Sequence, residues 1–195
     1  NIFLPNNLLK QGLILIDTPG LNSIREEYVK SYVEDALIES DAVIFITNID
    51  QGANKQDEII WKDYFKQIQP DSKRWILLNK LDSILTNEML TQSEKNDEVE
   101  KSLKSFSKTI NKDDNYRKYR IYPISARLAL IGKKKKDNQK LQESNLPIFE
   151  NDLFKSLTET RYKDFIEPEI VKVNKGIADL NFLFSEKSDQ QNFYC

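Results

Sequence analysis

The chain alternates short apolar runs with segments of helical periodicity, and this alternation restricts the fold more than any other feature of the sequence. The runs at residues 13–16, 42–47 and 75–78 are continuous in apolar residues or nearly so, which is typical of strands buried on both faces. A fourth strand is expected at residues 119–124, where Pro123 places it near a sheet edge or a strand end. Strands that alternate with helices indicate a parallel sheet with right-handed crossovers, so the predicted class is α/β.

Apolar residues at helical spacing fill the intervals between these runs. The predicted helices contain Tyr28–Leu37, run from Asn54 to Pro70, carry an apolar stripe from Val99 to Ile110, and cover Leu146–Leu157. Asn54 suits a helix N-cap, and Pro147 suits a first helical turn. Apolar residues from Ile170 to Phe184 repeat at spacings of three and four, which predicts an amphipathic helix that either leaves the domain or packs back on it.

The composition excludes several kinds of chemistry. The chain has no histidine, so catalysis by Ser-His-Asp or Cys-His groups and zinc sites with histidine ligands are excluded. Its one cysteine, Cys195, cannot form an internal disulfide and fits a reducing compartment, so we expect a cytoplasmic protein. The formal net charge of −2 gives no general attraction to nucleic acid, which we do not expect as a partner.

Asp17, Thr18, Pro19 and Gly20 follow the first apolar run directly. A carboxylate at a strand end suits Mg²⁺ held through a water molecule, because Mg²⁺ retains much of its hydration shell. A glycine three positions later allows the backbone to approach a terminal phosphate and donate its N–H. The alternative is a Pro-Gly turn that only ends the strand.

Asn79, Lys80, Leu81 and Asp82 follow the third run. An aspartate at this place suits the N1–H and N2 amino donors of guanine, whereas adenine has no N1–H and leaves such a carboxylate unpaired. The stem of Lys80 suits the plane of the base, and Asn79 suits a tie between neighbouring loops. The alternative is a polar loop that matches this pattern by chance.

Ser125, Ala126 and Arg127 follow the fourth predicted strand. A small residue here allows a backbone N–H to reach guanine O6, although the tripeptide alone is common in loops. The weight of the three motifs comes from their order and place. All follow predicted parallel strands, at whose carboxyl ends ligands bind in open α/β sheets.

These motifs resemble a known family. DTPG, NKLD and SAR resemble the third, fourth and fifth motifs of P-loop GTPases, and the wording of GLILIDTPGLNS, DAVIFITNIDQG, WILLNKLD and PISARLALIGKKKK is similar to bacterial dynamin-like proteins. The resemblance implies a partial dynamin-type GTPase domain over residues 1–160, with a P-loop GTPase-type parallel sheet flanked by helices. Residues 161–195 are then a helical extension, the start of a stalk.

The resemblance also implies the ligands and the site. The cofactors are GTP or GDP and Mg²⁺, with hydrolysis of GTP and no general base defined. The implied nucleotide-binding set is Asp17, Thr18, Gly20, Asn79, Lys80, Asp82, Ser125, Ala126 and Arg127. In this set Asp17 holds the Mg²⁺ water, Gly20 contacts the γ-phosphate, and Arg127 occupies a variable position. The resemblance implies, more loosely, that GTPase domains associate with one another and that the protein remodels or tethers membranes. Lipid would be contacted by regions outside this chain, with peripheral association at the inner membrane.

The phosphate-binding motif of such a domain is missing. The pattern G-x-x-x-x-G-K-[ST] is matched by none of Gly12, Gly20, Gly52, Gly132 and Gly176. The first-switch threonine expected before Asp17 is missing as well, and the resemblance implies a gap between the strand at 13–16 and the strand at 42–47. The chain starts at Asn1 without methionine. We therefore expect an excerpt of a longer enzyme that binds GTP weakly or not at all by itself.

Two other functions share these motifs. One is a translation-factor-related GTPase acting in ribosome or transfer-RNA maturation, and the other is a non-catalytic pseudo-GTPase that binds partners. Residues 133–136 are four consecutive lysines. They are expected to form a solvated loop, with contact to a phosphate or an anionic membrane as the alternative.

Overall fold

The computed structural model describes residues 13–18, 27–68, 73–113, 115–161, 167 and 170–178. The helices and strands within these ranges are α2 (Glu27–Glu39), β1 (Val43–Asn48), α3 (Lys55–Asp63), η2 (Phe65–Gln67), β2 (Arg74–Asn79), α4 (Asp82–Leu85), α5 (Gln92–Asn111), η4 (Tyr116–Lys118), β3 (Ile121–Pro123), α6 (Ala126–Lys135), α7 (Asn138–Glu143) and α8 (Leu146–Arg161). The chain divides into two compact units, Asn1–Pro147 and Ile148–Cys195.

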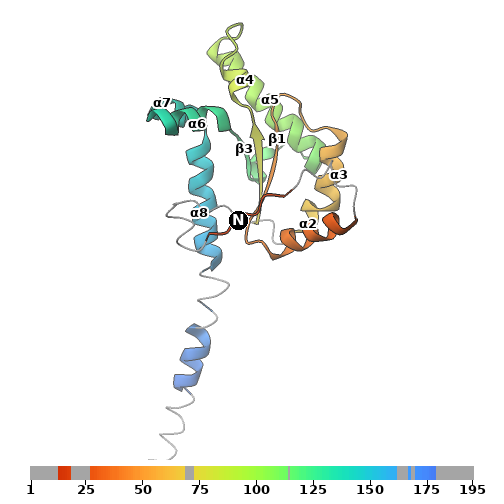
Figure 1. The fold of residues 1–195 in the computed structure, drawn as a ribbon, viewed down its shortest axis with the longest axis vertical. Coiled ribbons are helices and arrows are strands. Elements are labelled where there is room, and N and C mark those ends of the chain that lie inside the picture. Colours follow the sequence, from red (N-terminus) through yellow and green to blue (C-terminus); the bar gives the residue numbers. More distant parts are fainter. Residues whose placement is uncertain are drawn as a thin grey trace, which may run out of the picture. The chain divides into compact units, whose positions relative to one another are not determined.

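The first unit contains a parallel sheet of three strands in the order β1-β2-β3, with helices around it (Figure 1). Asn48 is in register with Asn79, and Leu78 is in register with Pro123, so the three strands end at one edge of the sheet. The α/β class and the parallel sheet are therefore confirmed. Pro123 lies at the end of the edge strand β3, as its missing N–H predicts.

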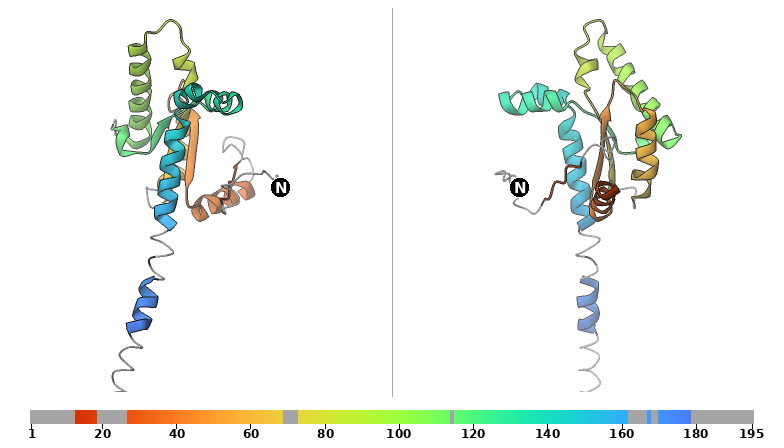
Figure 2. Two further views of the ribbon diagram at one scale, coloured as in Figure 1. Left: turned by 90° about the vertical axis from the view of Figure 1, so that its left-hand side faces the viewer. Right: turned by 45° about the vertical axis from the view of Figure 1, so that its right-hand side comes forward.

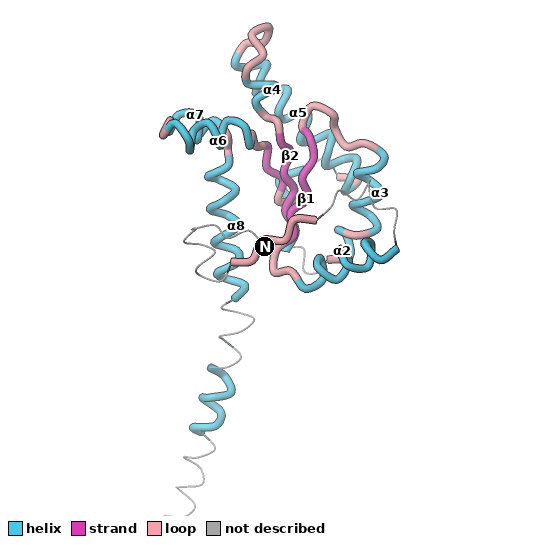
Figure 3. The backbone as a smooth tube through the Cα atoms, in the orientation of Figure 1, coloured by secondary structure: helices cyan, strands magenta, loops and turns pink. Residues whose placement is uncertain are grey.

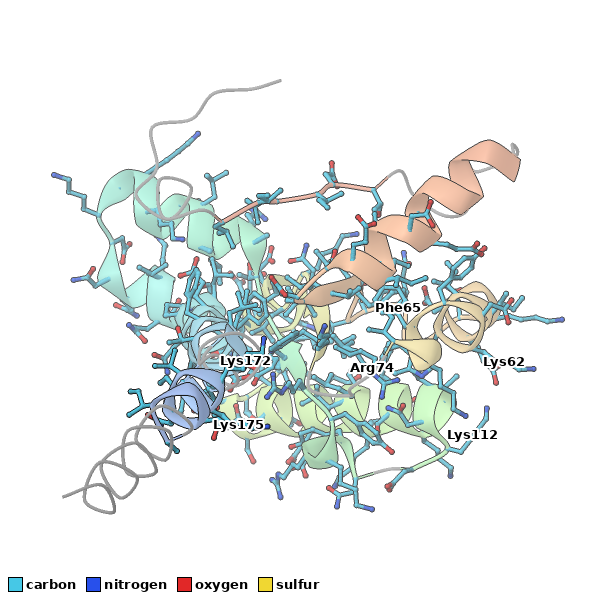
Figure 4. The ribbon with its side chains drawn as sticks, turned by 90° about the horizontal axis from the view of Figure 1, so that it is seen from below. Lys62, Phe65, Arg74, Lys112, Lys172 and Lys175 are labelled. Atoms are coloured by element: carbon cyan, nitrogen blue, oxygen red, sulfur yellow. The ribbon has the colours of Figure 1, made fainter. Side chains whose placement is uncertain are left out.

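One face of the sheet is covered by an aromatic and aliphatic core. Phe45 of β1 meets Trp61 and Phe65 edge-on, with ring centroids 6.3 Å and 5.1 Å away, and the Trp61 and Phe65 rings are stacked. Arg74, labelled beside Phe65 in Figure 4, lies over the Trp61 ring at 5.7 Å and donates from Nη1 to the Phe65 carbonyl at 3.3 Å. Leu103, Phe106 and Ile110 of α5 are buried in the same cluster. The apolar stripe predicted for this helix thus faces the core.

The prediction of a buried strand at residues 13–16 is wrong for the structure. Residues 13–18 are drawn as a loop in Figure 3, and Ile14, Leu15 and Ile16 are 81%, 75% and 52% exposed. A strand exists only through hydrogen bonds to a neighbour. Within the described ranges β1 pairs with β2 alone, so its other edge offers no partner strand to this segment. An aliphatic run is therefore insufficient to form a strand without its neighbour in the sheet.

The expectation of a loop at the four lysines is also wrong. Lys133, Lys134 and Lys135 form the last turn of α6, and Lys136 caps it in the left-handed conformation with φ 54°. The carbonyl groups of the last helical turn carry a partial negative charge, so cations are favourable there. The side chains are exposed.

The second unit is helical where it is described. It contains α8 from Ile148 onward and helical residues 170–178, where Ile170, Val173 and Ile177 are 46%, 60% and 52% exposed. The helix predicted after Pro168 is confirmed for these residues, and its continuation towards Phe184 lies outside the described part. None of the described helices is long and apolar enough to cross a bilayer.

The start of α5 is fixed by a reciprocal cap that depends on a charge. Thr91 N–H donates to Glu94 Oε2 at 2.7 Å, and Glu94 N–H donates to Thr91 Oγ1 at 3.4 Å. The hydrogen bonds from the Thr91 backbone and then from its hydroxyl hold the pKa of Glu94 below its usual value of 4.5. A lowered pKa in the folded state means that the cap stabilises α5 fully above pH 4.5 and loses this effect as the pH falls through the lower folded value.

We expect this dependence to appear in a comparison of wild type with Glu94→Gln by urea unfolding. Glutamine can still accept from Thr91 N–H but carries no charge, so wild type should be the more stable at pH 7, and the difference should be smaller at a pH below 4.5, where Glu94 loses its charge as the pH falls through its lowered pKa. Glu88→Gln, at an exposed position before the helix, serves as the control. A difference between wild type and Glu94→Gln that is the same at both pH values would contradict the role of the charge.

Candidate functional site

The loops after β1, β2 and β3 are joined by backbone hydrogen bonds at the edge where the strands end. Ile49 N–H donates to the Asn79 carbonyl and Leu81 N–H donates to the Ile124 carbonyl, both at 2.9 Å. Leu81 and Ile124 are 2% and 4% exposed, so each loop is held by a buried side chain as well. The sheet therefore places the motif that follows β2 directly beside the motif that follows β3.

Asp82 opens the short helix α4, and its side chain is 14% exposed. Its Oδ1 accepts a hydrogen bond of 2.6 Å from the Ser125 hydroxyl. The same hydroxyl oxygen accepts from Leu128 N–H at 3.0 Å as the N-cap of α6, and Ser125 is fully buried. Because the Ser125 hydroxyl accepts from the helix, its hydrogen is free to point at Asp82. One carboxylate oxygen is thus fixed in place by α6.

The second oxygen of Asp82 faces an exposed cation. Arg127 Nη1 lies 3.6 Å from Asp82 Oδ2, and the arginine side chain is 76% exposed. A pair with one such exposed partner contributes little to stability, about 0–1 kcal/mol. A ligand with N–H donors can therefore replace Arg127 at this oxygen at small cost. The pair was not foreseen from the sequence, which left the role of Arg127 open.

Asn79 ties the two motifs together as the sequence suggests. Its Oδ1 accepts from Ala126 N–H at 3.0 Å, across a separation of 47 positions in the chain. This bond engages the Ala126 N–H, whereas the sequence left open which backbone N–H of residues 125–127 would reach guanine O6. The next amide of the helix, Arg127 N–H, is in the second position of α6, where no carbonyl of the same helix is available to it.

Lys80 occupies a bend between β2 and α4 with φ 67°, in the left-handed region. Its carbonyl accepts from the Ser83 N–H at 2.9 Å and from the Ser83 hydroxyl at 2.8 Å, which holds the bend closed. A lysine in this conformation costs about 1–2 kcal/mol relative to a right-handed one, and such conformations cluster at functional sites. The Lys80 side chain is exposed at the same edge as Asp82.

The structure gathers only part of the predicted set. Asn79, Lys80, Asp82, Ser125, Ala126 and Arg127 lie together at this edge. Asp17 is exposed and Thr18 is half-buried, and within the described ranges no hydrogen bond or ion pair joins either of them to the group. Gly20 lies outside the described residues. The same described part contains no cluster of three or more acidic or cysteine side chains placed to hold a metal ion.

The arrangement around Asp82 suits a base that donates two adjacent N–H groups. The carboxylate is held by Ser125 and retains lone pairs on both oxygens for further donors. Its low exposure strengthens hydrogen bonds to a charged acceptor and penalises a ligand that leaves the acceptor unpaired. The residues present therefore fit the N1–H and N2 amino groups of guanine.

One contact in the site lies outside every motif found in the sequence. Ser125 N–H donates to the carbonyl of Ser144 at 2.9 Å. A backbone acceptor leaves no trace in residue type, so the sequence carries no signal for Ser144 itself. The neighbouring Asn145 is a weak signal, because asparagine is enriched in the left-handed conformation that it adopts here, with φ 56°.

Comparisons with known proteins found a family and a curated relative. Residues 6–125 match the family described as "Gtr1/RagA G protein conserved region". A curated protein of Caldicellulosiruptor sp. (strain Rt8B.4), described as "Uncharacterized protein in xynA 3'region", is 28% identical over 160 residues, which cover 82% of this chain and 36% of that protein. The chain thus spans about a third of the length of this relative. No solved structure matches the chain.

Proposed function

The chain belongs to the Gtr1/RagA G protein family, and from this premise we propose that it supplies the base-reading part of a GTP-binding domain. The observation that carries the proposal is the link between the two loops, in which Ser125 fixes Asp82 and Asn79 fixes Ala126. These contacts leave the carboxylate of Asp82 as the acceptor at the edge of the sheet. A GTP-binding function in general is what the family indicates.

Guanine is distinguished from adenine by what it offers to Asp82. The N1–H and N2 amino groups of guanine both donate to the carboxylate, while adenine has no N1–H and no N2 amino group to donate. The exposed stem of Lys80 covers one face of the base. Guanine O6 accepts from the Arg127 N–H at the start of α6, because the Ala126 N–H is engaged by Asn79. The partial positive charge of the helix N-terminus favours that acceptor.

For the phosphates, the proposal rests on Asp17, Thr18 and Gly20 of the DTPG motif. Asp17 is an exposed carboxylate, which suits a Mg²⁺ ion held through a water molecule. A bound Mg²⁺ ion would neutralise part of the negative charge of the phosphates. Hydrolysis of GTP to GDP belongs to the whole protein in this proposal.

We further propose that the whole protein is of the dynamin-like type. The similarity of the segments around the three motifs to bacterial dynamin-like proteins supports this, as does the separate helical unit with exposed aliphatic residues at 170–178. In such a protein the GTPase domains associate with one another, and the nucleotide state is coupled to membrane remodelling or tethering. A full-length protein that binds GTP and is recruited to RNA or ribosomal particles instead would support the translation-factor-related alternative.

The test of the proposed function is the nucleotide preference of the full-length protein. Titration with GTP and ATP by calorimetry should show GTP binding at least about a hundredfold tighter, because adenine offers Asp82 neither an N1–H nor an N2 amino donor. Equal binding of both nucleotides would contradict the base-reading role. Absence of any binding would favour the pseudo-GTPase.

Residues 1–195 alone should bind GTP weakly or not at all in the same measurement. The sequence contains no phosphate-binding G-x-x-x-x-G-K-[ST] motif, whose backbone amides and lysine provide most of the affinity for the phosphates. Guanosine, which has no phosphate, serves as the matched ligand for the base site. Micromolar affinity of this chain for GTP would contradict the prediction.

A further inference from the structure

The helices α6 and α7 form a hairpin (Figure 2), and Ser144, directly after α7, contacts Ser125 in the loop that follows β3. We propose that Gly132 and Asn145, on this hairpin and directly after it, are positioning residues that fix Ser125 and, through it, the carboxylate of Asp82. The inference rests on the proposed recognition of guanine by Asp82. It assigns a role to residues that belong to none of the nucleotide-binding motifs.

The contact between the hairpin and the loop is a pair of hydrogen bonds at the end of β3. Ser125 N–H donates to the Ser144 carbonyl at 2.9 Å, and the side chain of Asn145 donates from Nδ2 to the Pro123 carbonyl at 3.1 Å. Ser144 is fully buried, and its hydroxyl accepts from Leu146 N–H at 3.2 Å. The residues on both sides of Ile124 are thus held by the segment that follows α7.

Gly132 determines how closely α7 approaches α6. A Cβ atom at this position would lie 2.8 Å from the backbone nitrogen of Leu141 and 3.0 Å from the carbonyl oxygen of Asp137. Both distances are to backbone atoms, which cannot rotate away as a side chain can. The Gly132 carbonyl also accepts from Asp137 N–H at 2.9 Å, which closes the turn between the helices. Any larger residue at 132 must move α7, and Ser144 with it.

Asn145 combines a backbone conformation with a side-chain bond. Its φ of 56° lies in the left-handed region, which asparagine tolerates better than most residues and glycine adopts without strain. The two features can be separated by substitution. Asn145→Gly removes the bond to Pro123 and retains the conformation, while Asn145→Ala removes the bond and also strains the backbone.

The chain of contacts leads from the hairpin to the base. Ser125 N–H is held by Ser144, and the Ser125 hydroxyl is held between Leu128 N–H and Asp82 Oδ1. A shift of Ser144 therefore moves the hydroxyl that orients the carboxylate. Recognition of the guanine N2 amino group depends on that orientation. Inosine nucleotides lack this group and donate only N1–H to Asp82, so they depend on the orientation less.

The experiment compares GDP and IDP binding to the full-length protein and to its Gly132→Ala and Asn145→Gly variants. We expect GDP affinity to fall about tenfold in each, with a much smaller loss for IDP, so that the GDP-to-IDP preference shrinks. Gly176→Ala is the matched control, because a Cβ at Gly176 meets no atom within 4 Å. The GDP-to-IDP preference of Gly176→Ala should equal that of wild type. Asn145→Ala should behave as Asn145→Gly in preference and be less stable.

A role limited to stability predicts a different pattern, in which GDP and IDP affinities fall by the same factor. That result, or an unchanged GDP affinity in both variants, would overturn the inference. Exchange of the Ser125 and Ala126 amide hydrogens, followed by NMR on residues 1–195 without nucleotide, gives a readout that does not need guanine binding. Faster exchange in Gly132→Ala than in Gly176→Ala supports the contact even if wild type fails to bind GDP, whereas equal exchange contradicts it.

Discussion

Replacing Asp82 with asparagine should weaken GTP binding by the full-length protein about a hundredfold and create a preference for XTP. The N2 amino group of guanine meets an amide NH₂ instead of a carboxylate oxygen in this variant, so two donors face each other. Xanthine carries a carbonyl oxygen at C2, which accepts from that same NH₂. The substitution therefore reverses one hydrogen bond rather than removing the site.

The fold should survive this change, because asparagine keeps an Oδ1 that accepts from the Ser125 hydroxyl. Competition between labelled GTP and unlabelled XTP measures the preference directly. Asp97→Asn makes the same chemical change on the exposed face of α5 and should leave both affinities unaltered. Loss of GTP binding without any gain for XTP would indicate that Asp82 acts on the structure of the loop and not on the base.

Replacing Phe106 with alanine should destabilise the first unit by about 3–5 kcal/mol. Phe106 is fully buried, in a core that includes Phe45 of β1 and Ile121 of β3. Truncation removes its transfer free energy and leaves a cavity, because the surrounding strands relax only partly. The free energy of unfolding of domains of this size is about 5–15 kcal/mol in total, so the loss is a large share of it.

Urea unfolding followed by tryptophan fluorescence measures this effect, since Trp75 and Trp61 are both buried in the first unit. Met89 is 91% exposed in the loop before α5, and Met89→Ala should change stability by less than about 0.5 kcal/mol. If both variants unfold at the same urea concentration as wild type, α5 does not belong to the core of this unit.

The elements that could be predicted from the sequence are those whose signals are local. The run at 75–78 is buried in any sheet that contains it, and Asn54 caps α3 through a contact with Asp57, three residues later. The apolar stripe on α5 could be predicted from the periodicity of this segment alone. In contrast, residues 13–16 carry a strand-like pattern but require a neighbour for pairing, and a pattern of side chains cannot supply one.

The candidate site divides in the same way. The pattern of residue types predicts a site that contains Asn79, Lys80, Asp82 and the tripeptide at 125–127, because these residue types follow apolar runs in a fixed order. Two contacts of the site use backbone atoms, which every residue possesses. The Ala126 N–H donates to Asn79, and the Ser125 N–H donates to the Ser144 carbonyl. Such contacts depend on where the chain returns in space and are therefore invisible in residue types.

The hydrogen bonds that join the loops after β2 and β3 also bear on the order of folding. Asp82 and Ser125 are separated by 43 positions and Asn79 and Ala126 by 47, so both bonds close long loops through the α5 crossover. Contacts of such high sequence separation cost more loop entropy than helical ones and form slowly. The helices and their caps can therefore appear before any surface able to select a base exists. We therefore expect the arrangement around Asp82 to form late in folding, and a partly unfolded copy to lose it before losing its helical content.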